Sequence, residues 1–178
     1  QILKIKSKKK SEIHNIIKKK DAKIFCNYLF VNKKIISNYR VKKMGFFGKF
    51  EGIKKKKIKN ILISFGTANL KNSLKKQIYF EVTNFIKSKK KYNFNFYIDP
   101  IINVKKLKKA GYNIYKANYS KKMYQKIDLA IIKPGLGTVY DCLQNAIPII
   151  AYTKFFNEEF LYNAKVLEKK KLGINVRN

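Results

Sequence analysis

The sequence has 178 residues, of which 46% are hydrophobic, so it is long enough to bury a sizeable core. Its formal net charge of +32 comes almost entirely from lysine, because Arg40 and Arg177 are its arginines. Lys, Asn, Ile, Tyr and Phe, which AT-rich codons encode, are all abundant. We therefore attribute much of the positive charge to coding bias and expect it to be spread over solvated faces. Nucleic acid is therefore not the expected partner, and a peripheral contact with an anionic membrane is the lesser alternative.

Cys26 and Cys142 lie far apart and lack the spacing of metal ligands, which predicts two buried thiols and no metal or cofactor. No apolar run approaches the about 18 residues that span a bilayer, and no signal-peptide pattern opens the chain. We expect a cytoplasmic protein, with the inner face of the membrane as the alternative location. Because residue 1 is Gln, we also expect that the natural N-terminus is missing.

The first part of the chain shows few regular patterns. Residues 1–22 are rich in lysine and space three isoleucines as one helical face. Residues 22–31 predict a buried strand. In residues 39–50 glycines interrupt any regular pattern, and residues 54–57 form a charged linker.

From residue 58 onward, apolar runs alternate with helical spacings. Strands are predicted over residues 58–66, 93–99, 112–118, 127–132, 148–153 and 174–176. Helices are predicted over residues 73–88, 103–110, 121–126, 138–146 and 157–171. This alternation is typical of an α/β fold with a parallel sheet and helices on both faces.

The stretch IDLAIIKPGLGTVYDCLQNAIP, residues 127–148, predicts a strand, a glycine turn and a helix beginning near Thr138. Unpaired N–H groups and the helix dipole suit an anion at such a junction, and Asp141 is placed to accept hydrogen bonds from hydroxyls. A plain strand-to-helix turn has the same pattern, so that alternative stays open. A second strand-to-glycine junction ends at Gly66, and parallel strands bring both junctions to one edge of the sheet. Their convergence favours a nucleotide diphosphate site.

Three segments resemble, in order and spacing, the C-terminal donor-binding domain of GT-B glycosyltransferases of the MurG-like type (glycosyltransferase family 28). They are ISFGTANLKN (residues 63–72), IDLAIIKPGLGTVYDCLQNAIPII (residues 127–150) and FFNEEFLYNAKVLEKKKLGI (residues 155–174). The resemblance implies a Rossmann-like donor domain over residues 58–178, truncated at its C-terminus. Residues 1–57 would then be the tail of an N-terminal acceptor domain plus the interdomain linker.

The resemblance also implies roles for individual residues. The glycine turn faces the diphosphate, and the acidic residue after it, commonly glutamate in the family and Asp141 here, holds the ribose hydroxyls. Where many relatives carry a His-Gln pair that touches the donor sugar, this chain has Glu159-Phe160, so Glu159 either binds sugar hydroxyls or favours the helix N-terminus. The implied donor-binding set is Gly66, Thr67, Asn69, Lys133, Gly135, Gly137, Thr138, Asp141, Glu159 and Asn163.

The implied function is that of an inverting glycosyltransferase that uses a nucleotide-diphosphate sugar, with UDP as the expected nucleotide. The implied acceptor is lipid-linked or belongs to the cell envelope, no metal is required, and the catalytic base is expected in the N-terminal domain. Three alternatives remain: a nucleotide-sugar epimerase or hydrolase of the same fold, a non-catalytic donor-binding subunit that needs a partner chain, and an RNA-binding module that relies on the lysines.

Overall fold

The computed structural model describes residues 24–27, 41–44, 57–66, 72–100, 102–103, 105–154 and 158–176. The chain divides into two units, Gln1–Gly48 and Lys49–Asn178. In the first unit, β1 (Ile24–Asn27) pairs in parallel with β2 (Val41–Met44). β1 lies inside the predicted strand, whereas β2 corrects the expectation that no regular element forms in residues 39–50. The helix considered for residues 1–22 lies outside the described residues.

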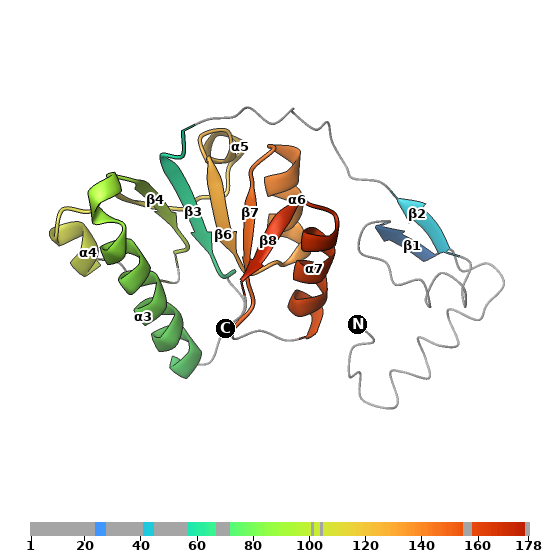
Figure 1. The fold of residues 1–178 in the computed structure, drawn as a ribbon, viewed down its shortest axis with the longest axis horizontal. Helices are drawn as coiled ribbons and strands as arrows, with labels where there is room; N and C mark the ends of the chain where they lie inside the picture. Colours follow the sequence, from blue (N-terminus) through green and yellow to red (C-terminus); the bar gives the residue numbers. More distant parts are fainter. Residues whose placement is uncertain are drawn as a thin grey trace. The chain divides into compact units, whose positions relative to one another are not determined.

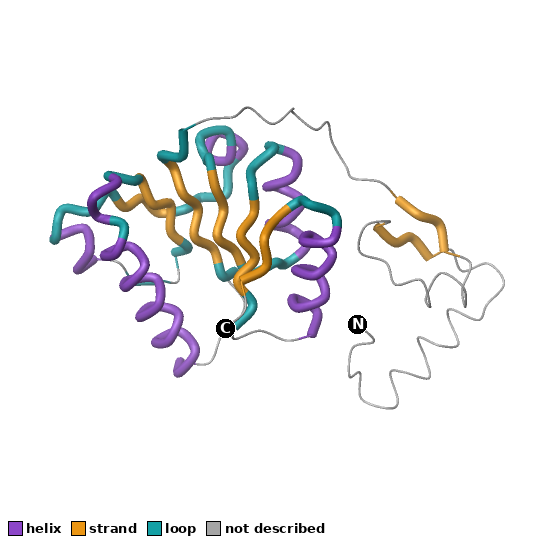
Figure 2. Tube along the Cα trace, in the orientation of Figure 1, coloured by secondary structure: helices purple, strands orange, loops and turns teal. Residues whose placement is uncertain are grey.

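The second unit is built on a six-stranded parallel sheet with the order β5-β4-β3-β6-β7-β8. Its strands are β3 (Asn60–Ser64), β4 (Asn95–Ile98), β5 (Ile114–Lys116), β6 (Leu129–Ile132), β7 (Ile149–Tyr152) and β8 (Gly173–Val176). Every neighbouring pair is parallel, and the strands form one layer (Figure 2). The predicted α/β, Rossmann-like sheet is confirmed, and all six carboxyl ends meet at one edge.

Helices connect the strands of this sheet. They are α3 (Asn72–Ser88), α4 (Lys105–Lys109), α5 (Lys121–Tyr124), α6 (Leu136–Gln144) and α7 (Glu158–Lys169), with a short 3-10 helix, η1 (Lys90–Tyr92), before β4. The strand order runs outward in opposite directions from the β3–β6 pair. Right-handed crossovers therefore place α3 and α4 on one face and α6 and α7 on the other (Figure 1).

The core between the sheet and α3 follows from two periodicities in the sequence. Ile61 and Ile63 lie two residues apart on β3 and share one face of the sheet. Ile78, Val82 and Ile86 lie four residues apart on α3 and cover that face. All five are at most 3% exposed, so each contributes about 1.5–3 kcal/mol by leaving water.

Asp128 joins the amino ends of β3 and β6. Its Oδ2 accepts hydrogen bonds from the Lys59 N–H at 3.0 Å, the Asn60 N–H at 2.8 Å and the Asn60 Nδ2 at 3.1 Å. Asp128→Ala leaves these donors without their acceptor, so we expect the free energy of unfolding to fall by about 1–3 kcal/mol. Urea unfolding followed by circular dichroism measures this, and an unchanged midpoint would contradict the role.

Ala146 ends α6 in a left-handed backbone conformation, with φ of 52°. The Ile147 N–H bonds to the Cys142 carbonyl at 2.9 Å, which closes the helix end around this residue. A Cβ is disfavoured in that conformation, so Ala146→Gly should raise the unfolding free energy by about 1 kcal/mol. The melting temperature reports the gain. A decrease would mean that the flexibility glycine adds to the unfolded chain outweighs the relief of strain.

Candidate functional site

The turn between β6 and α6 is held in place by both neighbouring elements. The Lys133 N–H donates to the Ser64 carbonyl at 2.9 Å, which extends the β3–β6 pairing by one residue. The Asn163 Nδ2, on α7 and almost fully buried, donates to the Pro134 carbonyl at 2.9 Å. Gly135 then starts the helix. Hydrogen bonds within the protein therefore fix the conformation of the turn. Asn163 contributes through the Pro134 carbonyl.

The amino end of α6 has the properties of an anion site. Gly135 is its N-cap, and no side chain caps the helix there. The first intrahelical bond runs from the Val139 N–H to the Gly135 carbonyl at 3.0 Å. The N–H groups of residues 136–138 have no partner inside the helix, and together with the helix dipole they favour a negative charge. The helix begins two residues earlier than predicted, so Gly137 lies inside its first turn.

Lys133 connects the two glycine junctions. A Cβ built on Gly66 would lie 2.8 Å from the Lys133 Nζ, and the φ of 81° at Gly66 also favours glycine. The same Nζ lies 4.7 Å from the centre of the Phe160 ring, at the start of α7. Burial lowers the pKa of Lys133, while the charges of Asp99 and Glu159 act to raise it. The structure thus gathers Gly66, Lys133, Phe160 and Glu159 at one edge of the sheet.

A buried polar group that sequence reasoning missed lies at the same edge. Ser64 ends β3, Asp99 follows β4, and Tyr119 follows β5. The Ser64 Oγ donates to the Asp99 Oδ2 at 3.4 Å and lies 2.9 Å from the Tyr119 hydroxyl. Burial raises the pKa of Tyr119, against the effect of its hydrogen bond with Ser64. Asp99 is the last residue of the strand predicted over residues 93–99, and that position was the sequence signal for its location.

Asp141 lies on α6 and faces Tyr124 at the end of α5. The Tyr124 hydroxyl is buried and has no hydrogen-bond partner at ordinary distances and angles. Burial is the main cause that raises the pKa of Tyr124, and the negative charge of Asp141 raises it further. The neighbouring Cys142 is a buried free thiol, as predicted for that cysteine, and burial raises its pKa. Asp141 lies on the same short helix that the glycine turn begins, because Gly135 is the N-cap of α6.

Three predicted features lie outside the described residues: Thr67, Asn69 and the side chain of Cys26. Within the described residues, no group of three or more His, Cys, Asp or Glu side chains is placed to hold a metal ion. Among the same residues, no helix is both long enough and apolar enough to cross a membrane.

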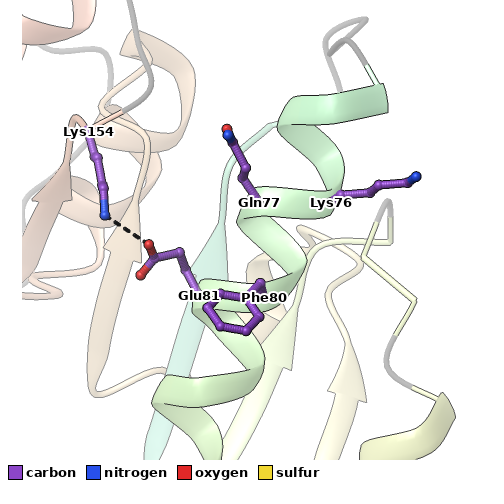
Figure 3. Close-up of a pocket in the computed structure, with 5 residues that line it drawn as sticks. All are labelled: Lys76, Gln77, Phe80, Glu81 and Lys154. Carbon is purple, nitrogen blue, oxygen red and sulfur yellow. Dashed lines mark hydrogen bonds and ion pairs between the residues drawn. The ribbon is translucent and has the colours of Figure 1, made fainter.

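A hollow of about 430 Å³ lies between α3 and Lys154, which is two residues after the end of β7 (Figure 3). It is lined by Lys76, Gln77, Phe80, Glu81 and Lys154. The Lys154 Nζ pairs with the Glu81 Oε1 at 2.9 Å, and both side chains are partly exposed. This hollow shares no residue with the glycine turns or the α6 amino end.

Comparison with known proteins finds solved structures with a similar fold. No protein-family model matches the sequence, and no curated protein matches it significantly. Several solved structures, in contrast, match the structure of this chain. The glycotransferase of kitacinnamycin aligns with a TM-score of 0.57 at 16% identity, over 83% of this chain and 38% of that one. The calicheamicin glycosyltransferase CalG4 also gives 0.57, at 13% identity, over 87% and 39%.

A third neighbour was solved with a nucleotide. The glycosyltransferase SsfS6 from Streptomyces sp. SF2575, complexed with thymidine diphosphate, aligns with a TM-score of 0.51 at 15% identity. The alignment covers 75% of this chain and 36% of that one. The chain thus spans less than two fifths of the length of these three glycosyltransferases and shares their fold.

Proposed function

We propose that the chain is the donor-binding part of a glycosyltransferase of the MurG-like type. It binds the nucleotide diphosphate of a UDP-sugar and serves transfer of the sugar to a lipid-linked or cell-envelope acceptor. The observation that carries the proposal is that Lys133 packs against Gly66 and the Phe160 ring at the carboxyl edge of the sheet, directly before the uncapped amino end of α6. The thymidine diphosphate reported with one structural neighbour supports a nucleotide at such a fold.

The proposed chemistry is displacement at the anomeric carbon. An acceptor hydroxyl attacks, the bond from the sugar to the diphosphate breaks, and negative charge develops on the leaving group. The N–H groups of α6 and the Lys133 ammonium stabilise that charge, because they are already oriented when the reaction begins. The acceptor proton goes to a base that we assign to an N-terminal acceptor domain.

The remaining predicted residues take proposed roles around this centre. Asp141 accepts hydrogen bonds from the ribose hydroxyls, and Glu159 does so from the sugar. Gly66 leaves room for the Lys133 ammonium, which we assign to the donor diphosphate, and Thr67 and Asn69 follow in that loop as proposed donor contacts. Thr138 adds a hydroxyl to the amino end of α6.

Calorimetric titration with UDP, GDP and dTDP sugars tests the nucleotide directly. We expect saturable UDP-sugar binding that is at least about tenfold tighter than binding of the GDP-sugar, which is a difference of about 1.4 kcal/mol. Binding of RNA with a steep salt dependence, together with indifference to UDP, would instead favour the RNA-binding alternative.

Gly135→Val tests the proposed close approach of the diphosphate. An added Cβ at this position meets only the Phe160 ring edge within 4 Å, at 3.7 Å, so the fold should accept the substitution. The branched side chain would stand where the phosphate must come near the backbone, so we expect at least tenfold weaker UDP binding. Unchanged UDP affinity in a variant that melts like the parent would refute the assignment.

A further inference from the structure

Positive charge is distributed unevenly over the main sheet. Residues 72–126, which carry α3, β4, α4, β5 and α5, contain 14 lysines and two carboxylates. One carboxylate, Glu81, pairs with Lys154, and the other, Asp99, is 1% exposed. Residues 127–176, which carry β6, β7 and β8, contain six lysines and five carboxylates. A coding bias acts on the whole sequence, so it does not explain why the β4–β5 half holds most of this charge.

Part of the charge gathers at the amino ends of β4 and β5, opposite the candidate site. The connection that precedes β4 and the one that precedes β5 lie side by side there. The Asn113 Nδ2 donates to the Asn93 Oδ1 at 2.7 Å, and the Lys90 Nζ lies 5.9 Å from the centre of the Tyr112 ring. The basic surface, as we call it, consists of Tyr92 and five exposed lysines: Lys87, Lys90, Lys91, Lys108 and Lys109. Within the described residues, none of these lysines pairs with a carboxylate.

Aromatic rings lie among the lysines of the basic surface. The Tyr92 side chain is 53% exposed, and its ring stacks on Phe94 with the ring centres 5.4 Å apart and the planes inclined by 14°. The Lys91 Nζ lies 5.0 Å from the centre of the Tyr92 ring. Lysine heads attract anionic headgroups, while lysine stems and tyrosine rings contact apolar groups at a membrane interface. This combination therefore suits the surface of an anionic membrane.

We propose that the basic surface is a docking site for an anionic phospholipid membrane. Its lysines contact lipid phosphates and carboxylates, and the exposed part of Tyr92 lies at the level of the headgroups. Because the surface is at the amino edge of the sheet, docking leaves the carboxyl edge uncovered. The inference is independent of the proposed function, since no residue of the basic surface belongs to the candidate site.

Two observations favour lipid over nucleic acid as the occupant. Bases of single-stranded nucleic acid stack on free ring faces, whereas the Tyr92 ring already stacks on Phe94 and has Lys91 over it. Residues 72–126 contain no arginine, the side chain whose planar fork binds phosphates and base edges in a bidentate manner. Lysine gives the less directional attraction that a fluid layer of headgroups requires.

Sedimentation with vesicles measures the docking. The full 178-residue chain is mixed, at about 0.15 M salt, with phosphatidylcholine vesicles that contain about 30% phosphatidylserine. We expect binding at least about tenfold tighter than to pure phosphatidylcholine. The triple variant Lys87→Gln, Lys108→Gln and Lys109→Gln keeps the lysines that contact rings. It should bind about 100-fold more weakly, because each lysine at an anionic surface contributes a factor of about five.

The matched control is the triple variant Lys165→Gln, Lys169→Gln and Lys170→Gln. These lysines are exposed on and just after α7, in the half of the sheet where the charges nearly balance. The control removes the same net charge, and we expect its vesicle binding to stay within about threefold of the parent. Thermal melting followed by circular dichroism verifies that both variants are folded. Equal losses in the two variants would overturn the proposal, because binding would then follow net charge alone.

Two further outcomes decide between the possible partners. If the parent binds both kinds of vesicle equally, the proposal fails. A single-stranded oligouridine is titrated in parallel, and a basic-surface variant that loses RNA binding but keeps vesicle binding would assign the surface to nucleic acid instead. Absence of UDP binding by the parent would refute the proposed function, and the vesicle result would still decide the role of the basic surface.

Discussion

Lys133→Met should weaken UDP binding by about 10- to 100-fold, because a hydrogen bond from a charged group contributes about 1.5–3 kcal/mol. Methionine keeps the length of the side chain and its contact with the Phe160 ring, so the charge is the principal loss. Burial lowers the pKa of Lys133, which means that the fold disfavours its charge. The variant should therefore be at least as stable as the parent while it binds less well. Calorimetry and urea unfolding measure the two effects separately.

The control for this experiment is Lys165→Met. Lys165 lies exposed on α7, so its replacement removes one charge from the same net total without touching the sheet edge. We expect its UDP affinity to stay within about twofold of the parent, because isolated exposed charges are screened by salt. Equal losses in the two variants would mean that UDP responds to overall charge, and the assignment of Lys133 would fail.

Gly173→Val should lower the free energy of unfolding by at least about 3 kcal/mol, the upper range for overpacking a filled interior. A Cβ at Gly173 would lie 2.6 Å from the Ile149 carbonyl oxygen and 3.1 Å from the Ile149 Cβ. Ile149 is paired with Gly173 in the β7–β8 register, and backbone cannot yield as a long side chain can. The strand must move or unpair, which urea unfolding and hydrogen exchange of β8 amides will show.

Gly137→Ala is the matched comparison for Gly173→Val. Apart from its chain neighbours and the backbone of its own helix, no atom lies within 4 Å of a Cβ built at Gly137, which is inside the first turn of α6. Alanine is favoured over glycine in a helix by up to about 1 kcal/mol, so stability should rise or hold. Similar losses at both glycines would show that steric contact with Ile149 does not govern the effect.

The elements that were predicted correctly carry strong local signals. Apolar runs bounded by glycine, proline or asparagine gave all six strands of the main sheet, and spacings of three and four gave α3 and α7. β2 was not predicted because its sequence, VKKM, shows neither a run of apolar residues nor an alternation of apolar and polar residues. The start of α6 was placed late because Gly135 caps the helix without a side-chain hydrogen bond, so no Ser, Thr, Asp or Asn marked it.

The partners of the candidate site were harder to predict than its glycines. A glycine turn after a strand is visible in the sequence, whereas the contact of Lys133 with Phe160 joins two different elements. Ser64, Asp99 and Tyr119 come from three strand ends that the strand order alone brings together. Each of these residues looks ordinary in its own segment. Their relation depends on which strands are neighbours, and that was not available from local patterns.

The strand order also determines how late in protein synthesis the candidate site can form. Asn60 and Asp128, which join the central strands, are 68 positions apart, and the whole β4–β5 half is synthesised between them. At about 5–20 residues per second, a ribosome needs roughly 3 to 14 seconds to cover that distance. During this interval the edge of β3 that later receives β6 has no partner from this sheet. If the proposed function holds, affinity for a nucleotide should therefore arise only late in synthesis. The unpaired side of β3 is the part of the nascent sheet that is most exposed to pairing with a wrong strand.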